Sequence, residues 1–148
     1  MSKLPEKFLG SLKTAIKGIV RVYKTELSFR IQFWFGIIVM TQIFYWPIGE
    51  IKRLILFLLI FLIWVLEILN TTFEKLFDEI EKRYHERIGY LKDILAGGVL
   101  IMTIGSVLIG LLVFWPYIID VALLSIIESI LIIIFLYLAR EVKKITKK

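Results

Sequence analysis

The 148 residues are 59% hydrophobic and 14% aromatic, with a mean hydropathy of +0.84, whereas soluble domains are about 45 to 50% apolar. This composition excludes an ordinary water-soluble domain and predicts one compact, all-α integral membrane unit. The formal net charge is +6, but Lys and Arg flank the apolar segments, where they suit anionic lipid headgroups, so we expect no nucleic acid partner. The absence of cysteine excludes a disulfide framework, a thiolate metal site and a nucleophilic thiol.

The N-terminal segment is basic and lacks a continuous apolar stretch. Its apolar side chains recur at helical spacing, namely Phe8, Leu12, Ile16, Ile19, Val20 and Tyr23. The lysines and arginines between them lie largely on other faces. This pattern predicts an amphipathic helix over residues 5–25, lying at the membrane surface. Because no small-residue cleavage site follows a hydrophobic region, we expect no signal peptide.

Four apolar segments follow, each long enough or nearly long enough for the ~20 residues that a helix needs to cross a bilayer. Their approximate limits are 29–46, 54–69, 94–115 and 118–139. The first segment ends in Trp46 before Pro47. The third ends in Trp115 before Pro116, so both combine an aromatic residue of the membrane interface with a helix stop. We therefore predict four transmembrane helices after the surface helix.

The basic residues alternate in number from one connection to the next. Seven Lys and Arg occur through Arg30, two at Lys52 and Arg53, five from Lys75 to Lys92, none over 116–119 and five from Arg140 onward. By the positive-inside rule, the N-terminus, the middle loop and the basic tail at 140–148 are expected to be cytoplasmic. The sequence thus predicts a multi-pass protein of the cell membrane with both termini on the cytoplasmic side.

The second span carries the most informative polar residues. Glu67, Asn70, Glu74 and Asp78 are spaced three or four apart, so on a helix they share one face. Carboxylate and amide oxygens are ligands for a hard cation such as Mg²⁺, which commonly combines one or two carboxylates with substrate phosphates. The alternative is a membrane helix that continues as a solvated cytoplasmic helix. That alternative explains Asp78 well and Glu67 poorly, because charges inside a span are costly.

Two further polar elements lie at the same predicted cytoplasmic depth. Glu26 and Arg30 are four residues apart and either contribute to the site or form a plain salt bridge. Lys92 and Asp93 precede the third span, where an ammonium would neutralise phosphate charge and a carboxylate would hold a nucleotide or orient the lysine. Snorkelling towards the interface would also explain Lys92. His85 is the sole histidine, and its alternative reading is a solvated loop residue.

Four sequence motifs occur together in this region. They are TELSFR at 25–30, EILNTTFE at 67–74, YHERIGYLKD at 84–93 and AGGVL at 96–100, with Asp78 between the second and third. In this order and spacing the chain resembles the prokaryotic diacylglycerol kinases, which include the undecaprenol kinases of Gram-positive bacteria. The resemblance covers about residues 8–115.

The resemblance implies a kinase domain at 1–115 that forms a homotrimer, with active sites shared between neighbours at the cytoplasmic interface. It also implies ATP as phosphoryl donor and Mg²⁺ as cofactor. By position, the resemblance makes Glu26 and Glu74 metal ligands and Glu67 the general base, with Asn70 beside the metal and the phosphates. It makes Lys92 a phosphate contact and Asp93 a nucleotide contact. It also puts three further residues near the nucleotide, namely His85, Glu86 and Gly89. No glycine-rich phosphate loop is present, which fits nucleotide binding through metal and lysine.

The reaction implied is transfer of the ATP γ-phosphate to the hydroxyl of a membrane lipid, either undecaprenol or diacylglycerol. The product would be undecaprenyl phosphate or phosphatidic acid. The alternative is a catalytically degenerate membrane scaffold of the same fold, supported by Thr71, Thr72 and bulky Phe73 where the family has small residues. A channel or transporter is less favoured, because the charges gather at one interface instead of along a pore.

Two other positions depart from the family pattern. Gln32 stands where an acidic residue is common, and we assign it no role. The resemblance implies three membrane helices and an N-terminal surface helix per subunit. The helix predicted at 118–139 is additional to these and carries Glu128 near its middle. We expect Glu128 to pair with Ser125 or Ser129 inside the protein and to lie outside the site.

Overall fold

The computed structural model describes residues 3–80 and 86–145 of the chain. The described residues form α1 (Lys3–Thr25), α2 (Leu27–Tyr45), α3 (Glu50–Ile80), α4 (Glu86–Phe114), the 3-10 helix η1 (Trp115–Tyr117) and α5 (Ile118–Ile145). No strand occurs within these ranges. The predicted all-α class is therefore confirmed.

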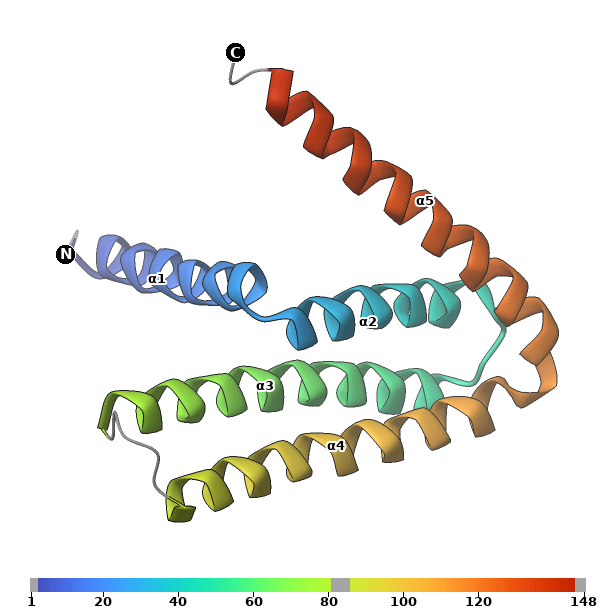
Figure 1. The fold of residues 1–148 in the computed structure, drawn as a ribbon. Coiled ribbons are helices and arrows are strands. Elements are labelled where there is room, and N and C mark those ends of the chain that lie inside the picture. The colour runs from blue at the N-terminus through green and yellow to red at the C-terminus, as the bar shows by residue number, and fades with distance from the viewer. Residues whose placement is uncertain (1–2, 81–85, 146–148) are drawn as a thin grey trace.

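Helix α3 lies between α2 and α4 and packs against both (Figure 1). Helix α1 leads into the start of α2 and also contacts α3. After α4, the chain turns at η1, and α5 passes the end of α2 before its C-terminal half diverges from the other helices (Figure 1). The layer of α2, α3 and α4 is thus the centre of the molecule, and α1 and α5 both extend from it.

Prolines end two of the helices, as the sequence predicts. The residue before a proline is disfavoured in the α conformation, and Trp46, before Pro47, has extended backbone angles of φ −92° and ψ 146°. Pro116 lies within η1, which separates α4 from α5. Residues 46–49 connect α2 to α3, and η1 connects α4 to α5.

Several helices extend beyond the predicted membrane spans. Helix α2 is Leu27–Tyr45 where the predicted span is 29–46, and α3 is Glu50–Ile80 where the predicted span is 54–69. Helix α4 is Glu86–Phe114 where the predicted span is 94–115, and α5 is Ile118–Ile145 where the predicted span is 118–139. An apolar run marks only the segment that suits lipid, whereas backbone hydrogen bonding continues a helix into water. Part of the tail expected at 140–148 is helical for the same reason.

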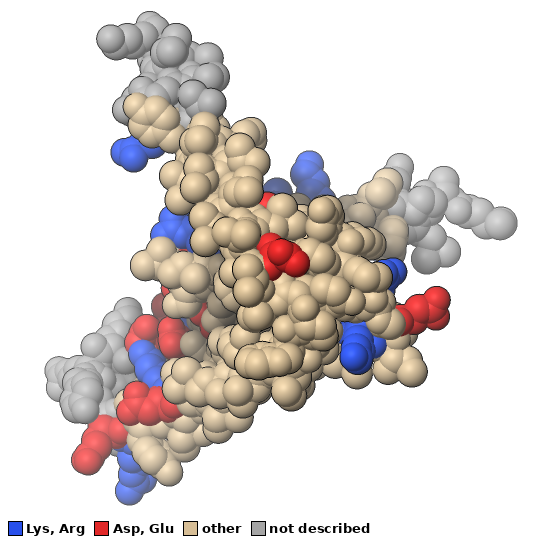
Figure 2. Space-filling view, turned by 90° about the vertical axis from the view of Figure 1, so that its right-hand side faces the viewer, with Lys and Arg blue, Asp and Glu red and all other residues tan. Residues whose placement is uncertain are grey.

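Three stretches are long and apolar enough to cross a membrane, namely Leu27–Tyr45, Glu50–Ile80 and Glu86–Tyr137. The last contains α4, η1 and most of α5, so the count of four crossings stays a prediction. Many large apolar side chains on these helices are exposed. In Figure 2, uncharged residues cover most of the face, and the charged side chains gather in separate groups. Such apolar surface indicates a membrane protein.

A close approach of α2 to α3 fixes their relative position. A Cβ atom on Gly36 would lie 2.8 Å from Trp64 Cζ2, so only glycine lets the indole ring lie this close to α2. Trp64 also stacks on Phe33, with 4.9 Å between ring centroids. Its Nε1 donates a hydrogen bond to the backbone oxygen of Gln32 at 3.2 Å. These contacts set which residues of α2 face the polar residues of α3.

Helix α5 is joined to α2 by polar contacts of Glu128. Its carboxylate accepts hydrogen bonds from the Thr41 hydroxyl at 2.8 Å and the Gln42 amide at 3.2 Å. The expectation that Glu128 pairs with Ser125 or Ser129 is therefore wrong, and the Ser129 hydroxyl instead donates to the Ser125 carbonyl at 2.7 Å. A serine in a helix readily bonds the carbonyl one turn back. This leaves the acid to contact the neighbouring helix.

Candidate active site

Three polar residues lie on successive turns of α3, and we call Glu67, Asn70 and Glu74 the polar face of α3. Because α3 is an unbroken helix through all three, their spacing directs them to one side. Glu67 is only 6% exposed, so this acidic residue of a membrane helix is buried. Asn70 and Glu74 are half-buried. The face therefore runs from a buried acid towards a more accessible pair.

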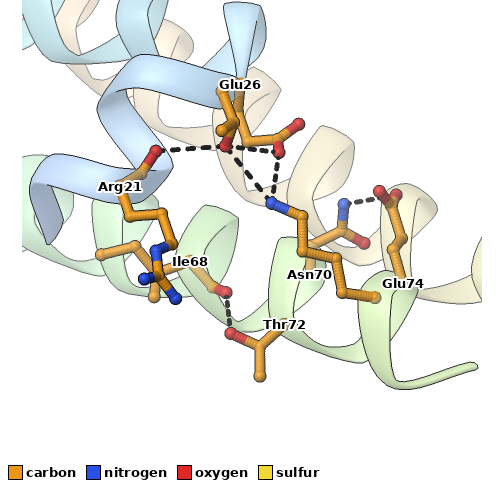
Figure 3. Close-up of polar contacts among 8 residues, drawn as sticks. Arg21, Glu26, Ile68, Asn70, Thr72 and Glu74 are labelled. Atoms are coloured by element: carbon orange, nitrogen blue, oxygen red, sulfur yellow. Dashed lines mark hydrogen bonds and ion pairs between the residues drawn. The ribbon is translucent and has the colours of Figure 1, made fainter. Parts of the chain in front are cut away.

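The two more accessible residues of this face are hydrogen-bonded to each other (Figure 3). Asn70 Nδ2 donates to Glu74 Oε1 at 2.9 Å. Asn70 Oδ1 is buried and has no hydrogen-bond partner within the described part of the chain. A buried acceptor without a partner is costly. An oxygen beside a carboxylate is also the kind of atom that a hard cation binds.

Glu67 is held by a side chain from α2. Gln32 Nε2 donates a hydrogen bond to Glu67 Oε2 at 3.3 Å. The other end of that amide, Gln32 Oε1, is buried and unpartnered among residues 3–80 and 86–145. Gln32, for which the sequence predicts no role, thus contacts the acid that the sequence singles out.

Glu26 connects α1 and α2 and faces α3 (Figure 3). Its extended backbone, with φ −104° and ψ 120°, separates the two helices. Its carboxylate accepts hydrogen bonds from Lys75 Nζ at 2.7 Å and Thr25 Oγ1 at 2.9 Å. The salt bridge with Arg30, which the sequence left open, is thus replaced by one with Lys75. The ion pair joins the start of α2 to α3 across the site.

The electrostatics of Glu26 follow from these two donors. The hydrogen bond from Lys75, followed by that from Thr25, holds the pKa of Glu26 below its usual range, although partial burial opposes this. The ion pair is therefore formed at neutral pH and is lost only as the pH falls through the lowered pKa. The Lys75 side chain is 53% exposed, and such exposed pairs contribute about 0 to 1 kcal/mol. Another cation can replace Lys75 at small cost.

The remaining candidate residues lie at or near the start of α4. Lys92 forms an ion pair with Asp78 of α3, which brings Lys92 to the same end of the helices as the polar face. Asp93 and Glu86 are exposed, and Gly89 is half-buried in the first turn. His85 lies outside the described residues. The structure thus brings Lys92 to α3 and leaves Asp93 and Glu86 at the surface.

The residues present fit a hard cation only in part. Over residues 3–80 and 86–145, no three His, Asp or Glu side chains are close enough together to hold a metal ion. Mg²⁺ needs fewer protein ligands, because it commonly keeps waters and binds phosphates as well. The Glu74 carboxylate and the unpartnered Asn70 Oδ1 supply such oxygen donors. The donor set therefore suits magnesium shared with a nucleotide better than a metal enclosed by the protein.

A family model described as prokaryotic diacylglycerol kinase matches residues 13–114. The chain belongs to the prokaryotic diacylglycerol kinase family. The matched residues include most of α1 and all of α2, α3 and α4, with every candidate site residue. Helix α5 lies beyond them. The resemblance inferred from the four motifs is confirmed.

The names of curated relatives are consistent with this family. The undecaprenol kinase of Bacillus subtilis (strain 168) is 34% identical over 110 residues, which are 74% of this chain and 89% of that protein. The diacylglycerol kinase of Escherichia coli (strain K12) is 30% identical over 102 residues, 68% of this chain and 83% of that protein. The diacylglycerol kinase of Synechocystis sp. (strain ATCC 27184 / PCC 6803 / Kazusa) is 33% identical over 103 residues. That last match covers 69% of this chain but 59% of the relative, less than two thirds of its length. By family, the chain is a lipid kinase.

Two contacts at this site were not predicted from the sequence. Gln32 is a polar residue inside an apolar span, which is itself a signal of function or of a buried partner. Lys75 carried no such signal, because lysine at a membrane edge is ordinary and its partner Glu26 lies 49 residues earlier. The contact of Gln32 with Glu67 could therefore have been predicted, whereas the contact of Lys75 with Glu26 could not.

Proposed function

We propose that this chain transfers the γ-phosphate of ATP to the hydroxyl of a membrane lipid, undecaprenol or diacylglycerol. The product is undecaprenyl phosphate or phosphatidic acid. The observation that carries the proposal is the buried Glu67 carboxylate, which lies one turn from Asn70 and two turns from Glu74 on a membrane helix. A carboxylate at this position would serve as a base at lipid depth, beside oxygen donors for the phosphate end of the reaction. The names of the relatives support both acceptors.

In the proposed reaction, Glu67 accepts the proton of the lipid hydroxyl. The hydroxyl oxygen forms a bond to the γ-phosphorus, the bond from that phosphorus to the bridging oxygen breaks, and ADP leaves. The hydrogen bond from Gln32 orients the Glu67 carboxylate for this proton transfer. The chain's contribution is to position the reactants and to neutralise charge, which phosphoryl transfer chiefly requires.

The phosphate and nucleotide contacts are assigned to residues at the same end of α3 and α4. Asn70 lies beside the phosphates, and Lys92 exchanges its Asp78 partner for phosphate oxygens. We assign nucleotide binding to Asp93, His85, Glu86 and Gly89. The exposure of Asp93 and Glu86 leaves them accessible to a nucleotide from the cytoplasm.

Glu26 and Glu74 would hold Mg²⁺, with Asn70 beside them. When bound, the ion neutralises charge on the phosphate oxygens. The weak, exposed Lys75 partner of Glu26 supports this role, because its loss costs little. Glu74 has a neutral amide as its hydrogen-bond partner, which leaves the charge of this carboxylate uncompensated by that contact.

We further propose that the chain lies in the cell membrane as a homotrimer that shares active sites between neighbours. The N- and C-termini are assigned to the cytoplasm, with α5 as a fourth crossing. The exposed apolar faces of α2, α3 and α4 support contacts with lipid and with further copies.

Binding of MgATP is expected to raise the thermal unfolding temperature of the detergent-purified protein by several degrees. A ligand present at 100 times its Kd stabilises the folded state by about 2.7 kcal/mol. The shift should require Mg²⁺ and be lost in Glu74→Gln, while Glu79→Gln, an exposed change on the same helix, should keep it. An unfolding temperature that MgATP leaves unchanged would instead favour the scaffold reading.

A further inference from the structure

A largely apolar groove of about 490 Å³ lies between α2, α3, α4 and α5. Gln32 lines this groove, and the same side chain donates a hydrogen bond to Glu67. The Gln32 side chain therefore connects the groove with Glu67, the proposed general base. A groove that is largely apolar and has the Gln32 amide beside Glu67 suits an amphiphile with a hydroxyl end and a hydrocarbon chain.

Helix α5 supplies one side of the groove. Ile118, Val121, Ser125 and Ser129 of α5 line it. Their spacings of three and four residues put them on one face of the helix. Because the family match ends at residue 114, this side of the groove comes from a part of the chain that the family pattern does not include.

Two contacts fix α5 against α2. Near the middle of α5, Glu128 accepts hydrogen bonds from Thr41 and from Gln42, and Gln42 is only 1% exposed. At the start of α5, Trp46 stacks on Tyr117 of η1 with 4.9 Å between ring centroids. The Gln42 amide links the two contacts, since its oxygen accepts a hydrogen bond from Trp46 Nε1 at 2.9 Å.

We propose that α5 forms one side of the binding groove for the hydrocarbon chain of the acceptor lipid, and that Glu128 is the residue that positions it there. An acidic side chain inside a span is costly and needs partners. The two hydrogen bonds from α2, both to Oε2 of Glu128, supply such partners and fix the rotation of α5, so that Val121 and Ser125 face the groove. The inference rests on the proposed function for the identity of the acceptor, but not for the existence of the groove.

Photo-crosslinking tests chain binding without any catalytic step. The full-length protein, in bilayers of an inert phospholipid, would be irradiated with a long-chain lipid alcohol that carries a diazirine on its hydrocarbon chain. We expect label on Val121 and Ser125, and we expect excess unlabelled alcohol to compete it away. Ile119 and Leu123 are exposed on other faces of α5 and serve as an internal control for bulk lipid. Label at Val121 and Ser125 that resists competition, or is absent, would overturn the proposal.

Three variants separate the role of Glu128 from damage to the fold. Glu128→Gln retains an oxygen acceptor and should keep the competed label, whereas Glu128→Leu should lose it. Ser125→Trp fills the groove and leaves the Glu128 contacts intact, so it should also abolish the competed label. Competed labelling that persists in both Glu128→Leu and Ser125→Trp would contradict the role of α5.

Kinetics provide the second readout. In Glu128→Leu, the apparent KM for the lipid alcohol should rise about tenfold, as expected when apolar contacts with a substrate chain are lost. The apparent KM for MgATP should not change, which distinguishes a displaced α5 from general damage to the fold. Competed labelling without phosphoryl transfer in the wild-type chain would refute the proposed kinase function and leave the groove assignment standing.

Discussion

Replacement of Glu67 by Gln is expected to lower kcat for phosphoryl transfer to the lipid by about 10²- to 10⁴-fold, the range that a positioned general base contributes. The amide keeps the size of the side chain and can still accept a hydrogen bond from Gln32, but it cannot take the proton of the lipid hydroxyl. The apparent KM for MgATP should change little, because Glu67 acts on the lipid side of the reaction. Initial rates with labelled ATP measure both constants.

The control for this substitution is Glu79→Gln. Glu79 lies on the same helix and is exposed, so the change in charge is the same but occurs away from the polar face of α3. The control should retain wild-type rates. A Glu67→Gln enzyme whose kcat stays within a few-fold of wild type would show that another group accepts the proton.

Replacement of Glu74 by Gln is expected to raise the Mg²⁺ concentration for half-maximal activity by at least about 10- to 100-fold, which is the loss that even indirect metal contacts cause. The substituted amide removes the negative charge, while its oxygen can still accept the hydrogen bond from Asn70. The defect should therefore shrink as Mg²⁺ is raised. A titration of rate against Mg²⁺ at saturating ATP measures the shift.

Glu26→Gln should shift the Mg²⁺ dependence in the same direction, because we assign Glu26 to the same ion. Glu79→Gln again provides the matched control on α3. A loss of rate in Glu74→Gln that is equal at every Mg²⁺ concentration would remove Glu74 from the metal ligands.

The features predicted correctly from the sequence depend on neighbours along the chain. The spacing of Glu67, Asn70 and Glu74 defines one face as soon as α3 is a helix, and Pro47 ends α2 by local sterics. Helix ends in water were less predictable. Charged residues after Glu74 continue α3 to Ile80, although hydropathy marks only the apolar part.

Two contacts that could not be predicted from the sequence join residues far apart in the chain. Glu26 pairs with Lys75 across 49 residues, and Glu128 bonds Thr41 across 87. Such pairs depend on how one helix is rotated and shifted against another. That register follows from packing details such as the approach of Trp64 to Gly36, which no local pattern reports.

Lipid phosphorylation is tested by transfer of labelled phosphate from ATP to undecaprenol and to diacylglycerol, measured side by side with detergent-purified protein. We expect Mg²⁺-dependent labelling of at least one of the two lipids and almost none with Glu67→Gln. Labelling by Glu74→Gln should be weak at low Mg²⁺ and recover as Mg²⁺ is raised. The lipid that is labelled identifies the acceptor. Folded wild-type protein that labels neither lipid would contradict the proposed function.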